Sequence, residues 1–187
     1  MKQHILPALR LTLVCIVFFC VIYPFFIWGI AQAAPAKGEG ETIKVNGKVT
    51  GYALEGQSFT ADKYFWGRPS AVGYNAAGSA GSNKGPSNPD YLKDVQSRID
   101  TFLVHNPGIK KEDIPSDLVT ASGGGLDPDI SPEAARIQVI RIAAVRKTSE
   151  EKILQLVQQS TQGPLLGLFG TQRVNVLKLN IALDELK

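Results

Sequence analysis

The sequence predicts one membrane-spanning helix followed by a single α+β domain that contains more helix than strand. Two features carry this prediction: an uncharged apolar segment near the N-terminus, and capped helix patterns separated by glycine- and proline-rich stretches in the rest of the chain. Of the 187 residues, roughly 150 follow the apolar segment, which is enough for one domain with its own core. A second domain is not expected.

The predicted transmembrane helix covers residues 11–31. No charged residue occurs from Leu11 to Ile30, and these 20 residues would form a helix about 30 Å long, the thickness of the hydrocarbon core of a bilayer. Aromatic rings gather at its outer end, where they favour the headgroup region. Pro24 predicts a kink at that end.

The charges on either side of this segment predict its orientation. Lys2 and Arg10 precede the segment, whereas the first charge after it is Lys37. The positive-inside rule therefore places residues 1–10 in the cytoplasm. The expected arrangement is a single-pass protein of the cell (inner) membrane with an extracytoplasmic domain.

A cleaved signal peptide is the alternative interpretation. Ala31-Gln32-Ala33 followed by Ala34 is typical of a small-residue cleavage site. The apolar segment is longer than the core of a signal peptide, usually about 7 to 15 residues, which favours a retained anchor. In both cases the domain is exported.

Composition excludes several kinds of site in the domain. Cys15 and Cys20 both lie in the apolar segment, so the domain has no thiol for a disulfide, a zinc site or a nucleophile. His105 is its single histidine, so no metal site is predicted. After the apolar segment 18 basic residues stand against 17 acidic ones, and this balance predicts no nucleic-acid partner.

The exported part begins with a predicted tether at residues 32–42, which are small, polar and flexible, followed by the globular domain at 43–187. Asn46-Gly47 separates Ile43-Lys44-Val45 from Lys48-Val49-Thr50. This pattern predicts a β-hairpin at the start of the domain.

A long loop is expected from Gly67 to Pro89, because glycine, serine, asparagine, alanine and proline dominate there. A helix follows, with Asn88 as its cap and Pro89 in the first turn, and it ends at Asn106-Pro107-Gly108. Its predicted buried stripe is Leu92, Val95, Ile99 and Phe102.

A second helix is predicted to start at Ser131-Pro132-Glu133, where serine caps and the acid favours the positive helix end. The third is predicted to start with a capping box of Thr148 and Glu151 and to end at Gly163-Pro164. The expected buried stripes are Ile137, Ile140 and Ala144 in the second helix, and Ile153, Leu156 and Val157 in the third. Val174, Val176 and Leu179 alternate loosely and suggest a last strand.

Two segments are candidates for ligand or partner contact. Ser122-Gly123-Gly124-Gly125 lets backbone N–H groups approach an anion, although a tight or mobile loop explains the same residues. Arg68 follows Tyr64-Phe65-Trp66 and either contacts a partner together with Trp66 or closes a loop over the core by a cation–π contact. Asp127-Pro128-Asp129 is typical of a turn rather than of an acid–base pair.

Several of these motifs, in this order, resemble the C subunit of the Kdp-type potassium-transporting P-type ATPases of bacteria. The resemblance extends over nearly the whole chain and includes the N-terminal helix. It is carried by Gly56-Gln57-Ser58-Phe59, Tyr64 to Ala71, Tyr74-Asn75, Ser79 to Asn83, Asn88-Pro89, Asp117 to Ser122, Leu126-Asp127-Pro128, Ile130-Ser131-Pro132, Ala134-Ala135, Gln138, Arg141, Val174 to Leu177, and Leu179-Asn180.

The resemblance implies a non-catalytic accessory subunit. Its expected partners are a channel-like subunit that selects potassium, a P-type subunit that hydrolyses ATP and a very small membrane peptide. The family is described as a catalytic chaperone that raises the affinity of the pump subunit for ATP. The nucleotide contacts would fall on Ser122, Gly123, Gly124, Gly125 and Gln138, and Gly124 departs from the serine that the family commonly has.

The described chaperone role requires the Ser/Gly segment to meet ATP in the cytoplasm, whereas the charge asymmetry places this segment outside. A simpler hypothesis is that the domain packs on the outer face of the channel-like subunit. The other class of function is a free-standing, membrane-anchored binding domain.

Overall fold

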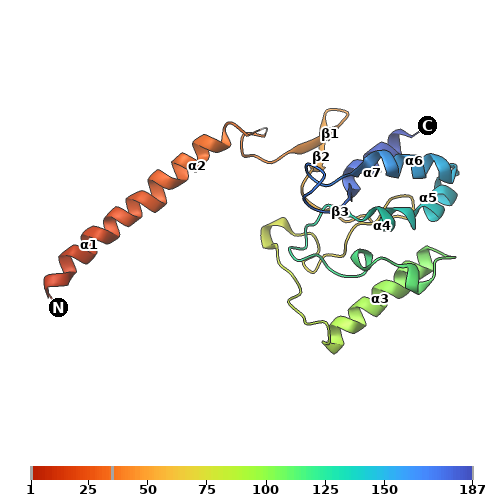
Figure 1. The fold of residues 1–187 in the computed structure, drawn as a ribbon, viewed down its shortest axis with the longest axis horizontal. Coiled ribbons are helices and arrows are strands. Elements are labelled where there is room, and N and C mark those ends of the chain that lie inside the picture. The colour runs from red at the N-terminus through yellow and green to blue at the C-terminus, as the bar shows by residue number, and fades with distance from the viewer. Residues whose placement is uncertain (1, 35, 187) are drawn as a thin grey trace. The chain divides into compact units, whose positions relative to one another are not determined.

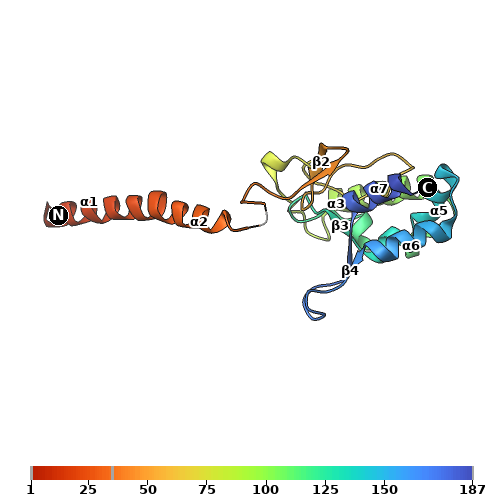
Figure 2. The same cartoon turned by 90° about the horizontal axis from the view of Figure 1, so that it is seen from above.

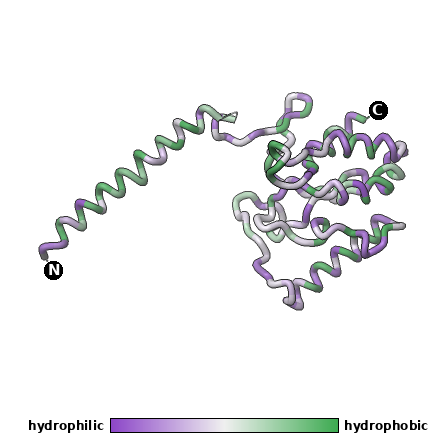
Figure 3. The backbone as a smooth tube through the Cα atoms, viewed as in Figure 1, coloured by the Kyte–Doolittle hydropathy of each residue, from purple (hydrophilic) through white to green (hydrophobic). Residues whose placement is uncertain are grey.

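The computed structural model describes residues 2–34 and 36–186 and divides into two units, with the boundary between Glu41 and Thr42. The first unit is helical: α1 at Lys2–Val17, the π-helical turn η1 at Phe18–Ile22, and α2 at Tyr23–Ala31 (Figure 1). Apolar residues dominate this helix after its first turns, which are more hydrophilic (Figure 3). Gln3–Ala31 is long and apolar enough to cross a membrane.

Pro24 explains the π-helical turn. Proline has no N–H to donate to the carbonyl four residues earlier, so the regular ladder cannot continue through it. The N–H of Tyr23 instead bonds to the carbonyl of Phe18. The helix therefore accommodates the proline by one wider turn. It also begins at Lys2, earlier than the predicted span at Leu11.

The second unit opens with the predicted hairpin. β1 (Thr42–Val45) pairs antiparallel with β2 (Lys48–Tyr52). The connecting residues have positive φ, +51° at Asn46 and +76° at Gly47. These angles suit the two-residue turn that joins twisted strands, and the hairpin prediction is confirmed.

A small antiparallel sheet lies deeper in the unit, with the strand order β3-β5-β4. Its strands are β3 at Asp129–Ile130, β4 at Thr161–Gln162 and β5 at Arg173–Asn175. The predicted last strand is confirmed only for Val174. Val176 and Leu179 lie in helix α7 (Val176–Glu185), because Asn175 accepts a hydrogen bond from the N–H of Lys178 and starts a helix there.

Helix α3 spans Pro89–His105 and confirms the first predicted helix. The side chain of Asn88 caps it by accepting hydrogen bonds from two backbone N–H groups of the first turn. Of the predicted stripe, Phe102 is buried, and Val95 and Ile99 pack partly against the core. Leu92 is exposed, which corrects the prediction for the first turn.

The second predicted helix is two helices, α4 at Pro132–Arg136 and α5 at Val139–Arg146. Ser131 caps α4 as expected. The break between α4 and α5 rotates the following residues, so the predicted stripe is wrong: Ile140 and Ala144 are exposed and Ile137 is only partly buried. The buried residues are Pro132, Ala134, Ala135, Gln138, Val139, Arg141, Ile142 and Ala143.

Helix α6 spans Glu150–Ser160, and its predicted buried stripe is confirmed. Its cap is Ser149, whose hydroxyl accepts from the N–H of Lys152, and not Thr148 as predicted. It ends at Ser160, before the predicted stop, because Thr161 begins β4.

The core lies where α4, α5, α6 and α7 meet the small sheet, and the side chain of Phe65 enters it from the loop after the hairpin. Figure 1 shows α5, α6 and α7 grouped together and α3 at the other edge of the unit. The predicted long loop is confirmed and contains the 3-10 turn η2 (Ala76–Gly78). Two more 3-10 turns follow α3, η3 at Lys111–Asp113 and η4 at Ser116–Leu118.

Candidate functional site

Gln138 lies in the break between α4 and α5 and is fully buried, with 0% exposure. Its Oε1 accepts hydrogen bonds from the backbone N–H of Trp66 (2.8 Å) and from Nη2 of Arg141 (2.8 Å). Its Nε2 donates to the carbonyls of Ala134 (3.0 Å) and Trp66 (3.2 Å). Both ends of the carboxamide are thus bound by the domain itself.

Arg141 extends this network from α5. Its guanidinium donates to the carbonyls of Asp62 (2.6 Å) and Tyr64 (3.1 Å) and to the side chain of Asn106 (3.0 Å). It also lies 4.6 Å from the centre of the Trp66 ring. Burial lowers the pKa of Arg141 to about 10, so the group remains charged at neutral pH.

The network secures the aromatic segment at residues 64–66. Phe65, at its centre, donates to Oδ1 of Asn180 (2.8 Å) and accepts from Nδ2 of Asn180 (3.0 Å), on helix α7. Trp66 is therefore part of the framework, and the cation on its ring is Arg141 rather than Arg68. The network joins segments that are far apart in the sequence, so spacing alone could not predict it.

The Ser/Gly segment packs against the long loop. The N–H of Ser122 donates to the carbonyl of Pro69 (3.1 Å), and the hydroxyl of Ser79 donates to the carbonyl of Gly124 (2.9 Å). Ser122 is 3% exposed, and Gly125 is also buried and has φ +72°. Gly123 and Gly124 are exposed.

The hydrogen bonds of these two candidates lead to different parts of the domain. The Ser/Gly segment is bonded to the loop that follows Arg68, whereas Gln138 is bonded to the aromatic segment before it. The polar groups of Gln138 are already paired, and the exposed part of the Ser/Gly segment is limited to two glycines.

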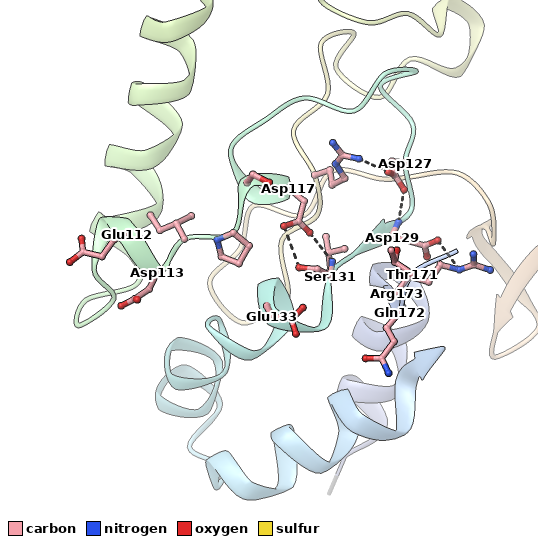
Figure 4. A pocket seen from close by; sticks show the side chains of 15 residues that line it. Glu112, Asp113, Asp117, Asp127, Asp129, Ser131, Glu133, Thr171, Gln172 and Arg173 are labelled. Carbon is pink, nitrogen blue, oxygen red and sulfur yellow. Dashed lines mark hydrogen bonds and ion pairs between the residues drawn. The ribbon is translucent and has the colours of Figure 1, made fainter. Parts of the chain in front are cut away.

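Arg68 lines a cavity of about 740 Å³ (Figure 4), which the sequence did not predict. Its Nη1 lies 2.8 Å from Oδ2 of Asp127, while its buried Nε has no hydrogen-bond partner among the described residues. Six carboxylates and two guanidinium groups line the cavity: Glu112, Asp113, Asp117, Asp127, Asp129, Glu133, Arg68 and Arg173.

The carboxylates of this cavity are held in part by local hydrogen bonds. Asp127 accepts from the N–H of Asp129 (3.0 Å), a turn contact that agrees with the prediction for this segment. Asp117 accepts from the N–H of Ser131 (2.7 Å) before α4. Burial raises the pKa of Asp129, with Arg173 opposing the shift from 3.3 Å. The described residues contain no group of three or more His, Cys, Asp and Glu side chains arranged to hold a metal ion.

A second cavity, of about 390 Å³, lies between the long loop and α3. Its lining includes the rings of Phe59, Trp66, Tyr74, Phe102 and His105. Tyr74 donates to the carbonyl of Arg68 (2.7 Å), and burial raises its pKa. This contact ties the loop after Arg68 to the framework.

One apolar N-terminal helix followed by one α+β domain is the organisation of a membrane-associated subunit, the class that the resemblance predicted. Over residues 5–185 the chain matches the family described as KdpC, the c chain of K+-transporting ATPase. The chain belongs to this family.

Individual relatives support the assignment over the full length. The potassium-transporting ATPase KdpC subunit of Flavobacterium psychrophilum is 62% identical over 185 residues, with 99% of this chain and 100% of that protein covered. The subunit of the same name from Bacteroides fragilis is 53% identical over 188 residues, covering 99% and 98%. That from Polaromonas naphthalenivorans is 50% identical over 191 residues, covering 100% and 97%.

Proposed function

We propose that this chain is the accessory subunit of a high-affinity, ATP-driven potassium uptake complex, and that its domain packs outside the cytoplasm against the channel-like subunit. Membership of the KdpC family supports the place in the complex. Lys2 and Arg10, before the apolar helix, support the orientation. The P-type pump subunit and the small membrane peptide are the other expected partners.

The observation that carries the structural role is the saturated network around Gln138. A side chain that contacts a nucleotide needs free donors or acceptors, and both ends of the Gln138 carboxamide are already used within the core. The residue therefore serves to hold Trp66 and Arg141 in place. A domain stiffened in this way presents a fixed surface to a partner.

The second candidate function is the catalytic chaperone, in which the Ser/Gly segment contacts ATP on the pump subunit. The exposure of Gly123 and Gly124 favours it, because their backbone groups are accessible. This function requires the segment to face the cytoplasm, which the charge asymmetry opposes.

Deletion of the chain tests its place in the complex. We expect cells without it to lose growth at limiting potassium, and expression of the intact chain to restore growth. Purification through a tag on this chain should recover the channel-like subunit from the restored cells. Unimpaired high-affinity uptake after deletion would contradict the proposal and favour a free-standing binding domain.

A further inference from the structure

The loop between β4 and β5 carries a cluster of four exposed large apolar side chains, here called the apolar tip. Their exposed fractions are 70% for Leu165, 81% for Leu166, 81% for Leu168 and 64% for Phe169. Figure 2 shows the loop projecting beyond β4, away from the helices of the domain. Single exposed apolar residues are ordinary, but four in one short loop indicate a contact surface.

The tip is a closed turn. Leu165 and Phe169 exchange two backbone hydrogen bonds of 2.8 and 3.0 Å, and the N–H groups of Gly167 and Leu168 bond to carbonyls at 3.0 and 3.1 Å. Leu166 has φ +54°, a conformation that costs free energy for a leucine. The turn thus holds its apolar side chains outward while pairing several of its own backbone groups.

The chemistry of the tip favours hydrocarbon over a protein groove. No charged residue occurs from Ile153 to Gln172, and the tip has no side-chain hydrogen-bond donor or acceptor. Protein interfaces are enriched in Tyr, Trp, Phe, Met and Arg, whereas leucine, which supplies three of the four side chains of the tip, is under-represented among their energetic centres. Leucine and phenylalanine enter a bilayer favourably, and backbone groups there must be paired internally, as several in this turn are.

We propose that the apolar tip inserts into the surface of the lipid bilayer in which the N-terminal helix is anchored. Residues 32–41 separate the apolar helix from the domain, and ten extended residues span at most roughly 35 Å. The domain is therefore kept close to the membrane. This inference rests on the anchoring of the helix, and it is independent of which subunit the domain packs against.

The test uses the full chain in vesicles of phosphatidylethanolamine and phosphatidylglycerol. Leu166→Cys, in a background of Cys15→Ser and Cys20→Ser, is labelled with an environment-sensitive fluorophore. We expect a blue-shifted emission and loss of fluorescence when nitroxide-labelled lipids are included. The same label on Leu166→Cys combined with Leu165→Ser, Leu168→Ser and Phe169→Ser should lose both effects.

Two further labels separate failure of this inference from failure of the anchoring. A label on Cys20 should be quenched because it lies in the apolar helix, and one on Lys93→Cys, an exposed position on α3, should not be quenched. Quenching at Cys20 without quenching at Leu166→Cys would overturn the inference and leave the anchoring intact. Equal quenching at Lys93→Cys would mean that the domain contacts the lipid non-specifically, which would also overturn the inference. Shielding of Leu166→Cys only when the other pump subunits are added would make the tip a protein-docking surface and also overturn it.

Discussion

Gln138 connects the break between α4 and α5 with the aromatic segment through a single carboxamide. In Gln138→Ala the partly buried N–H of Trp66 and the buried Nη2 of Arg141 both lose their acceptor. We expect a loss of about 2–4 kcal/mol in the free energy of unfolding, from unpaired polar groups and the space left behind. Chemical denaturation of the purified chain in detergent measures this loss.

Gln158→Ala is the matched control, because Gln158 lies on the exposed side of α6. Its free energy of unfolding should change by no more than about 0.5 kcal/mol. The catalytic-chaperone description predicts a different result, namely that Gln138→Ala weakens the apparent ATP affinity of the assembled pump. That weakening with an unchanged free energy of unfolding would refute the structural role.

Arg68 combines an ion pair at 2.8 Å with a position on the wall of the cavity that six carboxylates line, here called the acidic cavity. We predict that Arg68→Ala changes the free energy of unfolding by at most about 1 kcal/mol, because the pair is partly solvated. Co-purification with the channel-like subunit should nevertheless be lost, because the partner-contact interpretation of Arg68 requires its guanidinium.

Arg173→Ala is the control for this variant, because it removes another guanidinium from the same cavity. The channel-like subunit should still co-purify with the control. If Arg68→Ala also assembles normally and the potassium affinity of the pump is unaltered, Arg68 is a loop-closing residue only.

The Ser/Gly segment offers the same substitution in two different environments. A Cβ at Gly125 would lie 2.6 Å from Cγ2 of Val72 and would have to adopt φ +72°, whereas one at Gly123 meets no atom within 4 Å. We predict that Gly125→Ala lowers the free energy of unfolding by about 1–3 kcal/mol and that Gly123→Ala changes it by less than about 0.5 kcal/mol. Equal effects of the two substitutions on thermal unfolding would mean that Gly125 is not held closely against Val72.

Local signals predicted those helices and turns whose ends depend on nearby residues. Asn88 caps α3 through its own first turn, and Asn46-Gly47 adopts the positive φ angles of a hairpin. Where two neighbouring residues can both cap, as Thr148 and Ser149 can, the sequence pattern does not decide between them.

The features that the sequence did not predict depend on contacts between residues that are far apart in the sequence. The break before α5 coincides with the bonds from Gln138 to Trp66, and such a pairing leaves no periodic signal. The acidic cavity also gathers Arg68, Asp117, Asp127 and Arg173 from separate segments. Family resemblance pointed to Gln138, and the aromatic residues beside Arg68 pointed to Trp66, but their contact with each other required the folded structure.

The location of the globular domain decides between docking outside the cell membrane and contact with ATP. The Ser/Gly segment cannot reach cytoplasmic ATP if it lies on the outer side of the bilayer. Gly123 is the suitable reporter position, because it is exposed and a side chain there meets no neighbour, whereas Ser122 is only 3% exposed.

The most direct measurement is therefore the labelling of Gly123→Cys by a membrane-impermeant thiol reagent on intact spheroplasts, in a chain without Cys15 and Cys20. Lys93→Cys is exposed in the same domain, so labelling there without labelling at Gly123→Cys would indicate a partner that covers Gly123. Gln3→Cys reports the opposite side of the membrane. We predict labelling of Gly123→Cys and Lys93→Cys in spheroplasts, and labelling of Gln3→Cys only in inverted vesicles. The reverse pattern would contradict the proposed orientation and restore the Ser/Gly segment as a nucleotide site.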